Sequence, residues 1–381
     1  MGSLVLPGAS IGIIGGGQLG KMLSIAAQSL GYKVTIWSEE EDCPACRVTT
    51  SAVIGKYTDK KKLLQFIELV DIATVETEHI PLDTLQEVEK SIPLYPNSNI
   101  IGTAQNRKKE KLWLKNKEFP VAPFQLITSI DDVIEFKQKH NEDIVVKTIT
   151  GGYDGKGQLL ITGNVLKEIE IEQIKKWLSS GNDLIAEVWL PIKAELSVIA
   201  ARNKNGFIPF PVVENQHRHH ILHRTIAPAR LEKEVTSEAI KLTEQVMEQM
   251  DYRGLLCVEF FYDKNGHLYI NELAPRPHNS GHHTLEATIT SQFEQTIRAI
   301  CGLPLGDTRL ITPCVMTNLL GDLWHDHFKI ENILKEPSTK LHLYGKKEAR
   351  LKRKMGHYTT LADTLDEALA IAEKIYLSLT D

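Results

Sequence analysis

The stretch LLCVEFFYDKNGHLYINEL, residues 255–273, contains two runs of apolar and aromatic residues on either side of Asn265-Gly266. An Asn-Gly pair between two such runs is a strong signal for a β-hairpin. A two-residue turn at this pair places Glu259 directly opposite Glu272. A four-residue turn changes the partners but keeps both acids on one face, whereas a three-residue turn would put them on opposite faces.

The two facing acids predict a cation site. Directly opposed Cβ atoms lie about 5 Å apart, so two carboxylates repel each other unless a cation lies between them. Apolar neighbours such as Val258 and Phe260 make uncompensated charge costly. Carboxylate oxygens suit Mg²⁺ held jointly with nucleotide phosphates, and Asn271 adds a neutral oxygen. The alternative is that each acid pairs with a separate Lys or Arg.

A second signal lies upstream, in the glycine-rich segment GGYDGKGQ, residues 151–158. It falls between two predicted strands, residues 144–148 and 158–162, and lacks the P-loop pattern. The N–H groups of such a loop can point at phosphate oxygens. Lys147 ends the preceding apolar run; its ammonium group either extends into solvent or binds a phosphate, and the adjacent loop favours phosphate.

A third signal is the first glycine motif of the chain, Gly15-x-Gly17-x-x-Gly20, which follows the apolar run 11–14 and precedes apolar residues at helical spacing. With Glu39 about 20 residues on, it fits the dinucleotide-binding fingerprint. Glycines at a helix N-terminus admit any phosphate, so a sugar monophosphate fits equally well. A tight turn without ligand is the third interpretation.

The wider pattern predicts an α/β (α+β) chain. Strands alternate with helical segments over the first hundred residues, which indicates a parallel sheet, and strands become frequent after residue 144. A helix is expected at residues 364–379. A length of 381 residues suggests two or three domains.

Composition excludes several classes of protein. The net charge of −5 argues against a surface made for nucleic acid, and no apolar stretch is long enough to span a membrane. Five scattered cysteines do not form a disulfide framework, so we expect a reducing, cytoplasmic location. Cys43 and Cys46 form a C-x-x-C without a zinc or thioredoxin context, and we predict two unpaired thiols.

Four motifs occur in order along the chain: GGGQLG from Gly15, GGYDGKGQ from Gly151, NELAPRPHNSGH from Asn271 and RKMGH from Arg353. Together they resemble the ATP-grasp superfamily and, within it, the N5-carboxyaminoimidazole ribonucleotide synthetase family, over essentially the whole chain. The resemblance implies an ATP-grasp fold, with a Rossmann-like parallel-sheet domain at residues 1–104, an ATP-grasp domain at 105–304 and a small C-terminal region at 305–381.

The implied activity is the carboxylation of the exocyclic amine of 5-aminoimidazole ribonucleotide, through carboxyphosphate, in purine biosynthesis. ATP and bicarbonate are the implied co-substrates, Mg²⁺ is the implied cofactor, and a homodimer is expected. Three alternatives stay open: a formate-dependent glycinamide ribonucleotide transformylase, a nicotinamide oxidoreductase built on the first glycine motif, and a nucleotide sensor without catalysis.

The resemblance also implies roles for individual residues. Those implied to bind ATP are Arg107, Lys147, Gly152, Tyr153, Asp154, Gly155, Lys156, Gly157, Gln158, Glu187, Val188, Trp189, Leu190, Glu195, His217, Asn271 and Glu272. Those implied to act in catalysis are Arg276, His278, Asn279, Lys354, Tyr153 and Asp154. Those implied to bind the ribonucleotide are Gly17, Gln18, Leu19, Glu76, Lys346, Arg353 and Lys354. Glu259 and Glu272 are the implied Mg²⁺ ligands.

Three points stay open within this set. His278 is a candidate base, an orienting donor or a structural histidine. Two groups of histidines leave a zinc site possible by spacing alone, although the same segments fit the nucleotide interpretation: His217, His219, His220 and His223, and His278, His282 and His283. The family often has Arg-Pro-Gly before RKMGH, whereas Leu351 and Lys352 follow Arg350 here, so the shape of this basic loop is uncertain.

Overall fold

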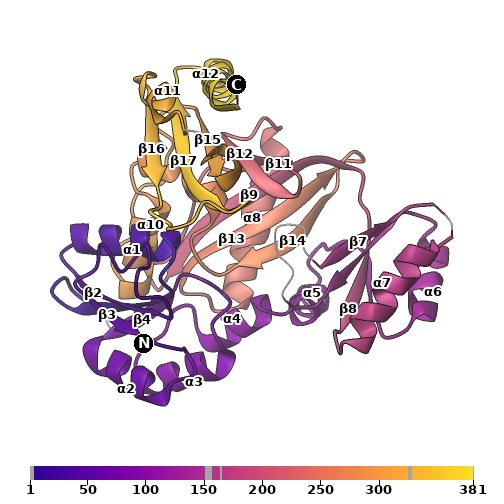
Figure 1. Ribbon diagram of the computed structural model, residues 1–381, viewed down its shortest axis with the longest axis horizontal. Coiled ribbons are helices and arrows are strands. Elements are labelled where there is room, and N and C mark those ends of the chain that lie inside the picture. Colours follow the sequence, from indigo (N-terminus) through magenta and orange to yellow (C-terminus); the bar gives the residue numbers. More distant parts are fainter. Residues whose placement is uncertain (1–3, 151–156, 164, 325–327, 381) are drawn as a thin grey trace.

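The computed structural model describes residues 4–150, 157–163, 165–324 and 328–380. Its first part is a parallel sheet with strand order β3(Ser51–Ile54)-β2(Lys33–Ser38)-β1(Ser10–Ile14)-β4(Ile72–Val75). Helices α1(Gln18–Ser29), α2(Lys60–Leu69) and α3(Leu82–Ser91) alternate with these strands, as Figure 1 shows in indigo and purple. The predicted parallel-sheet domain is therefore confirmed.

A small antiparallel lobe follows. Its strand order is β5(Phe124–Ile127)-β8(Leu184–Val188)-β6(Ile144–Thr148)-β7(Gln158–Ile161). Helices α6(Ile130–His140) and α7(Glu168–Ser179) lie beside this sheet at the far side of the molecule (Figure 1). The helices α4(Ser98–Ala104) and α5(Arg107–Asn116) connect the lobe to the first domain.

The third part is a nine-stranded sheet that runs through the centre of Figure 1. Its order is β14(Leu268–Ala274)-β13(Gly254–Asp263)-β9(Ile192–Asn203)-β11(Val213–Arg218)-β12(Ile221–Ala227)-β15(Cys314–Leu320)-β17(Lys354–Leu361)-β16(Thr339–Leu343), with β10(Gly206–Pro209) paired to β9. The helical segments that accompany it are α8(Lys233–Gln249), η1(Asn279–Gly281), α9(Thr284–Ala287), α10(Gln292–Cys301), η2(Gly321–Trp324), α11(Ile330–Leu334) and α12(Leu365–Thr380). The last three strands therefore extend the same sheet rather than form another.

The hairpin β13–β14 corrects the predicted turn. The Asp263 N–H donates to the His267 carbonyl at 2.9 Å, and Gly266 has φ +86°, so the turn has three residues and the two-residue prediction is wrong. That register alone would separate the acids. A β-bulge at Asn271 shifts the register by one residue and brings the two acids opposite each other again. Phe260 pairs with Ile270, whereas Glu259 pairs with Glu272.

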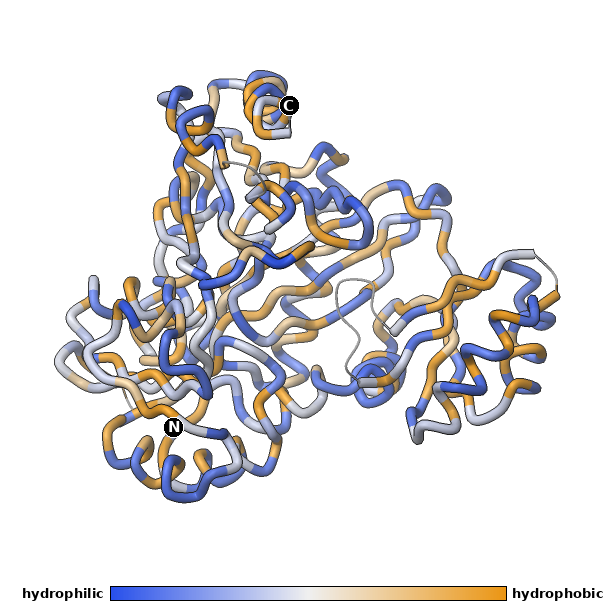
Figure 2. Tube along the Cα trace, viewed as in Figure 1, coloured by the Kyte–Doolittle hydropathy of each residue, from blue (hydrophilic) through white to orange (hydrophobic). Residues whose placement is uncertain are grey.

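Apolar side chains form the core between helices and sheets. On the large sheet, Val246 and Met247 of α8 pack against Leu256 and Val258 of β13, all fully buried. Figure 2 shows this pattern as orange along the strands and mixed orange and blue along the helices. Among the described helices, none is both long enough and apolar enough to cross a membrane.

The C-x-x-C pair also differs from expectation. Cys43 and Cys46 are joined by a disulfide, with the two Cα atoms 5.1 Å apart, so the prediction of two unpaired thiols is wrong. The pair lies in the connection between β2 and β3. Two residues, Pro44 and Ala45, lie between the cysteines, and the tight turn that they form brings the sulfurs together.

Candidate active site

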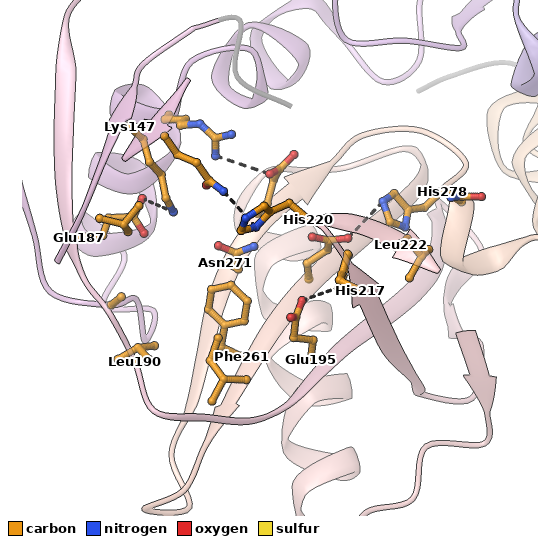
Figure 3. Close-up of a pocket in the computed structure, with 18 of the residues that line it drawn as sticks. Lys147, Glu187, Leu190, Glu195, His217, His220, Leu222, Phe261, Asn271 and His278 are labelled. Atoms are coloured by element: carbon orange, nitrogen blue, oxygen red, sulfur yellow. Dashed lines mark hydrogen bonds and ion pairs between the residues drawn. The ribbon is translucent and has the colours of Figure 1, made fainter. Parts of the chain in front are cut away.

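A cavity of about 410 Å³ lies between the small lobe and the large sheet. Figure 3 shows Lys147 and Glu187 on the small-lobe side, facing Asn271, Phe261 and Glu195 of the large sheet. The predicted ATP residues that line it are Arg107, Lys147, Gln158, Glu187, Val188, Trp189, Leu190, Glu195, His217, Asn271 and Glu272. Five others, Gly152, Tyr153, Asp154, Gly155 and Lys156, lie outside the described residues, and Gly157 does not line the cavity.

The paired acids lie at the centre of this cavity. The Glu272 carboxylate is 3.6 Å from the Arg107 guanidinium, and the Glu259 carboxylate is 3.3 Å from Nε2 of His278. Burial, together with the negative charge of Glu272, raises the pKa of Glu259 to about 7. The bulge places Asn271 beside Glu272 in the same wall.

This donor set fits Mg²⁺ better than zinc. It offers two carboxylates and one amide oxygen, the hard ligands that Mg²⁺ takes together with phosphate groups. The raised pKa of Glu259 comes first from burial and then from the negative charge of Glu272, and a cation bound between the two carboxylates would relieve both. Within the residues that the structure describes, no group of three or more His, Cys, Asp or Glu side chains is arranged to hold a metal, so the zinc alternative is not supported.

A buried charge cluster forms the small-lobe wall. The Glu187 carboxylate accepts from Nζ of Lys147 at 3.0 Å and lies 3.3 Å from Nζ of Lys111. Burial opposes ionisation, but the Lys111 and Lys147 charges outweigh it and lower the pKa of Glu187 to about 2. Burial likewise lowers the pKa of Lys147. The side chain of Glu187 therefore holds Lys147 at the cavity wall.

The opposite end of the cavity combines an apolar slot with a polar pair. Val145, Leu190, Leu222 and Phe261 offer apolar surface suited to a flat ring. Near them, Nδ1 of His217 is 2.9 Å from the Glu195 carboxylate. Burial lowers the pKa of His217, but the hydrogen bond and charge of Glu195 outweigh it, and the net shift is upward. His220 contacts Gln158 at 3.5 Å across the cavity (Figure 3).

A second cavity of about 270 Å³ adjoins the first. The predicted substrate residues Gln18, Leu19, Glu76 and Lys354 line it. The residues that line both cavities are Glu78, His79, Arg276, His278, Asn279 and Lys354. The two cavities therefore meet at the residues predicted to act in catalysis.

The N–H groups of the first glycine turn bind a carboxylate of the chain itself. The N–H groups of Gly17 and Gly20 both donate to the carboxylate of Glu76. A Cβ atom at Gly15 would lie 2.1 Å from Cγ of Glu76, so this close approach requires glycine. The buried carboxylate of Glu76 occupies the anion position at the start of α1, and the assignment of this turn to the sugar phosphate of the substrate stays a prediction.

Glu78 is a site residue that the sequence argument missed. Its carboxylate forms a two-point ion pair with the guanidinium of Arg276, with Nη2 to Oε1 at 2.9 Å. Burial favours the neutral acid, but Arg276 outweighs it and lowers the pKa of Glu78 to about 2. A usable signal existed, because Glu76 and Glu78 both follow the buried strand β4, and the carboxyl ends of parallel strands hold ligands.

Helix α5 contributes two further residues that were missed. Glu110 and Lys111 are almost completely buried. The backbone N–H of Leu273 donates to Glu110, and burial together with the charge of Glu272 raises the pKa of Glu110. The signal available was the helical spacing of Arg107 and Lys111, which places both cations on one face.

The segment after β14 supplies the groups that face both cavities. Nδ1 of His278 lies 2.8 Å from Oγ of Ser280. Burial, assisted by the charges of Arg276 and Lys354, lowers the pKa of His278 to about 3, so its imidazole is neutral near pH 7. The side-chain amide atoms of Asn279 are buried without a protein partner among the described residues. Unpaired buried polar atoms beside a cavity favour a bound polar ligand.

The basic loop turns at the point where the sequence departs from the family pattern, at Leu351 and Lys352. Lys352 has φ +65°, the left-handed conformation that glycine adopts readily. Nζ of Lys346 donates to the Lys354 carbonyl at 2.8 Å, and Arg353 donates to the Glu348 carbonyl at 3.1 Å. Lys346 and Arg353 line neither cavity, so their predicted contact with substrate stays a prediction.

Comparison with protein families covers most of the chain. Residues 9–105 match the ribonucleotide synthetase preATP-grasp domain, residues 112–293 the ATP-grasp domain, and residues 314–371 the phosphoribosylaminoimidazole carboxylase C-terminal domain. The chain is 42% identical over 365 residues to an N5-carboxyaminoimidazole ribonucleotide synthase of Bacillus subtilis, covering 96% of this chain and 94% of that protein.

Solved structures agree with this similarity. An N5-carboxyaminoimidazole synthetase from Staphylococcus aureus complexed with ADP has a TM-score of 0.91 and 38% identity, covering 98% of this chain and 99% of that one. An N5-carboxyaminoimidazole synthase from Aspergillus clavatus, in complex with ADP and 5-aminoimidazole ribonucleotide, has a TM-score of 0.89 and 27% identity, with 98% of each chain covered.

Proposed function

The chain belongs to the N5-carboxyaminoimidazole ribonucleotide synthase family of ATP-dependent ligases, and on that premise we propose how its residues perform the reaction. The relatives support carboxylation of 5-aminoimidazole ribonucleotide and not the formate-dependent alternative, which is wrong. The oxidoreductase and sensor alternatives are wrong as well, because the family consists of ATP-dependent ligases.

The observation that carries the proposal is the shared wall of the two cavities. ATP occupies the larger cavity and the ribonucleotide the smaller one. Arg276, His278, Asn279 and Lys354 line both cavities, so an acid activated at the nucleotide meets the amine without crossing solvent. Such placement supplies much of the rate enhancement of a two-substrate reaction.

At the nucleotide, charge is balanced by fixed groups. Arg107 and Lys147 bind the ATP phosphates, and Glu195 with His217 binds the ribose hydroxyls. Glu259 and Glu272 would hold Mg²⁺, which when bound neutralises charge on the phosphate chain. These cations stabilise the transferring phosphoryl group without reorganising during the reaction.

Bicarbonate is the co-substrate in this proposal. Glu78 takes the Nε and Nη2 edge of the Arg276 guanidinium, and the N–H groups that remain on Nη1 and Nη2 can donate to a planar anion. The amide of Asn279 offers both a donor and an acceptor. A bicarbonate oxygen takes the terminal phosphoryl group of ATP, which gives carboxyphosphate and ADP. The exocyclic amine of the substrate then attacks the carboxyl carbon, or CO₂ released from it, and phosphate leaves. With its pKa near 3, His278 is a poor base at neutral pH and acts as an orienting group.

The experiment that tests the reaction measures ADP release. ATP is supplied with Mg²⁺, and 5-aminoimidazole ribonucleotide and bicarbonate are added together or omitted in turn. We expect full release only when both are present. Equal release without the ribonucleotide would overturn the proposal.

Arg276→Ala tests the bicarbonate position. We expect carboxylation to fall by about 100-fold or more, because a site lacking an anion-binding group loses transition-state stabilisation, while ADP binding stays within about twofold. The variant leaves the partly buried Glu78 without its partner, which itself costs stability. The double variant E78Q/R276A removes that charge. Restored folding without restored activity, while the single variant E78Q keeps activity, assigns the loss to Arg276. Near-normal turnover of R276A or of the double variant would remove Arg276 from the mechanism.

A homodimer and a cytoplasmic location complete the proposal. Both rest on similarity to the family and on the sequence composition. Light scattering of the purified chain measures the first, and fractionation of the source cells measures the second.

A further inference from the structure

The proposed reaction makes no use of the disulfide between Cys43 and Cys46. We propose that these two residues form a reversible thiol–disulfide site, which exchanges with small dithiols and disulfides and whose reduction weakens binding of the ribonucleotide. The redox site stands on the disulfide and its surroundings. The effect on substrate also rests on the proposed function of the smaller cavity.

The disulfide lies directly behind the glycine turn of the smaller cavity. A Cβ atom at Gly16 would lie 2.7 Å from Sγ of Cys43, so the sulfur is packed against the turn. The Ala45 N–H, between the two cysteines, donates to the Gly16 carbonyl at 3.0 Å. Gly17 follows Gly16 in the turn, and its N–H donates to Glu76, which lines the smaller cavity. A short chain of direct contacts therefore links the sulfurs to the substrate wall.

The two sulfurs differ in exposure, which sets the order of the exchange. Cys43 is 2% exposed, whereas Cys46 is half-buried and is the sulfur that solvent reaches. A reductant thiolate attacks Sγ of Cys46, forms a mixed disulfide and expels Cys43 as a thiolate. The backbone N–H of Cys46 points at Sγ of Cys43 at 3.0 Å and stabilises that charge.

A small dithiol completes the exchange. Its second thiol attacks its own sulfur in the mixed disulfide and releases Cys46. Two electrons and two protons pass to the protein, which gains two thiols, and the reductant leaves as a disulfide. The reverse reaction with an oxidised dithiol restores the bond. No oxidant beyond the disulfide reagent is needed.

Breaking the bond has a mechanical consequence at Arg47. Two unbonded sulfurs separate to about the 3.5 to 4 Å of ordinary contact. Cys43 is held in the apolar core against Gly16, so Cys46 and the adjoining Arg47 take up the displacement. The Arg47 guanidinium lies 3.3 Å from the position of a Cβ atom on Gly345, so it rests against the basic loop.

The basic loop connects this displacement to the substrate. Gly345 precedes Lys346, whose ammonium group donates to the carbonyl of Lys354, and Lys354 lines both cavities. Two residues before Gly345, the Leu343 carbonyl accepts a hydrogen bond from Nζ of Lys21 at 3.1 Å. When the Arg47 side chain moves away from the basic loop, the position of Lys354 at the smaller cavity becomes less fixed. The small-lobe wall of the ATP cavity stays in place.

The first part of the test counts thiols in the native protein. The full chain is equilibrated with mixtures of reduced and oxidised dithiothreitol, and exposed thiols are tagged with a maleimide that adds mass. We expect the oxidised chain to take no tag and the reduced chain to take a tag at Cys46. Hydrogen exchange, read by mass spectrometry, should rise on reduction in residues 39–50 and 344–354. A chain that stays untagged in excess dithiothreitol, or that shows unchanged exchange, overturns the redox site.

The second part measures KM in the two redox states. We expect KM for 5-aminoimidazole ribonucleotide to rise about fivefold on reduction, the lower end of ordinary coupling between sites, while KM for ATP changes by less than about twofold. Unchanged KM for the ribonucleotide overturns the control of binding. A chain that is inactive toward this substrate in both redox states contradicts the proposed function instead. In that case the thiol tagging and the hydrogen exchange alone test the redox site.

Variants assign the response to this pair. The double variant C43S/C46S should lose the response to dithiothreitol, and the single variant C46S serves if the double variant fails to fold. Cys314, buried in β15 and unpaired, is the matched control, because C314A should keep the full response. A response that persists in C46S would contradict the assignment.

Discussion

Glu259 and Glu195 are two acids of the large sheet that face the same cavity, yet their partners differ. Glu195 is paired with His217, whose pKa is raised. Glu259, in contrast, has the neutral His278 beside it and faces a second carboxylate, Glu272. Charge repulsion between Glu259 and Glu272 is relieved by a cation, and the hydrogen-bonded Glu195 needs none. The two residues therefore form a matched pair for testing the metal site.

We expect Glu259→Gln to remove the Mg²⁺ dependence of nucleotide binding. In the unmodified chain, Mg²⁺ should tighten ADP binding by at least about tenfold, or ~1.4 kcal/mol. In the variant, ADP should bind equally well with and without Mg²⁺, measured by isothermal titration calorimetry. Glu195→Gln weakens ADP binding in both conditions but keeps the ratio. A Mg²⁺ effect that survives Glu259→Gln would move the metal to other ligands.

Lys352 has a left-handed backbone conformation that favours glycine. Its φ of +65° costs a residue with a Cβ atom roughly 1 kcal/mol relative to glycine. The Lys352 N–H also donates to Oδ1 of Asp322 at 2.6 Å, which holds the turn in place. The residue thus keeps a conformation that its own side chain disfavours.

The expected result is that Lys352→Gly is more stable than Lys352→Ala by about 1 kcal/mol. Both variants remove the same charge, so the difference isolates the backbone. Chemical denaturation of the two variants measures it. At a position with ordinary helical or extended backbone the order is reversed, because glycine gains more freedom in the unfolded chain. Equal stability would mean that the turn relaxes in solution.

At the scale of strands and helices, the sequence predicted the types of element better than their registers. The alternation of strands and helices in the first hundred residues and the hairpin around Asn265-Gly266 were both readable, because they depend on local pattern. The three-residue turn and the bulge at Asn271 were not readable. The bulge adds one residue and so offsets the odd number of residues in the turn. The register that results is fixed by the pairing of β13 with both of its neighbours, β14 and β9.

The candidate site residues also fall into those that local sequence predicts and those that depend on tertiary contacts. Lys147, Glu259 and Glu272 could be placed because the strand and turn that carry each one are local. Glu76 and Glu78 act through contacts with Gly17 and Arg276, residues 59 and 198 positions away. Such pairings depend on tertiary structure, so the sequence argument assigned Arg276 to bicarbonate without its partner.

Helix α5 holds both walls of the nucleotide cavity. Arg107 reaches Glu272 on the large sheet, and one turn later Lys111 reaches Glu187 on the small one. Lys111 and Glu187 are both almost completely buried, so their charges are weakly screened. The helix therefore fixes the separation of the two sheets at the phosphate end of the site.

We expect Lys111→Met to destabilise the chain by about 2 to 3 kcal/mol, less than a fully broken buried pair, because Lys147 still neutralises Glu187. The low pKa of Glu187 means that this stability is present above about pH 4.5 and is lost as pH falls toward 2. Denaturation of both chains at several pH values should show a constant difference above pH 5 that shrinks toward pH 3. A difference that does not depend on pH would mean that packing, not charge, is lost.

For the whole molecule, the shared wall means that neither substrate binds to an independent site. Arg276, His278 and Lys354 face both cavities, so a ligand in one cavity fixes side chains that the other ligand contacts. Ordering these groups costs conformational freedom once, and the second ligand to bind avoids that cost. The two affinities should therefore be positively coupled.

We expect a non-hydrolysable ATP analogue to tighten binding of 5-aminoimidazole ribonucleotide by about 5- to 20-fold, and the ribonucleotide to tighten binding of the analogue by the same factor. Calorimetric titrations in both orders measure the two factors, and their equality follows from linkage whichever ligand binds first. In Lys354→Met, which removes a shared cation but leaves Lys147 at the phosphates, both factors should fall toward one together. Strong coupling that survives this variant would show that closure of the two sheets around the nucleotide, and not the shared wall, connects the cavities.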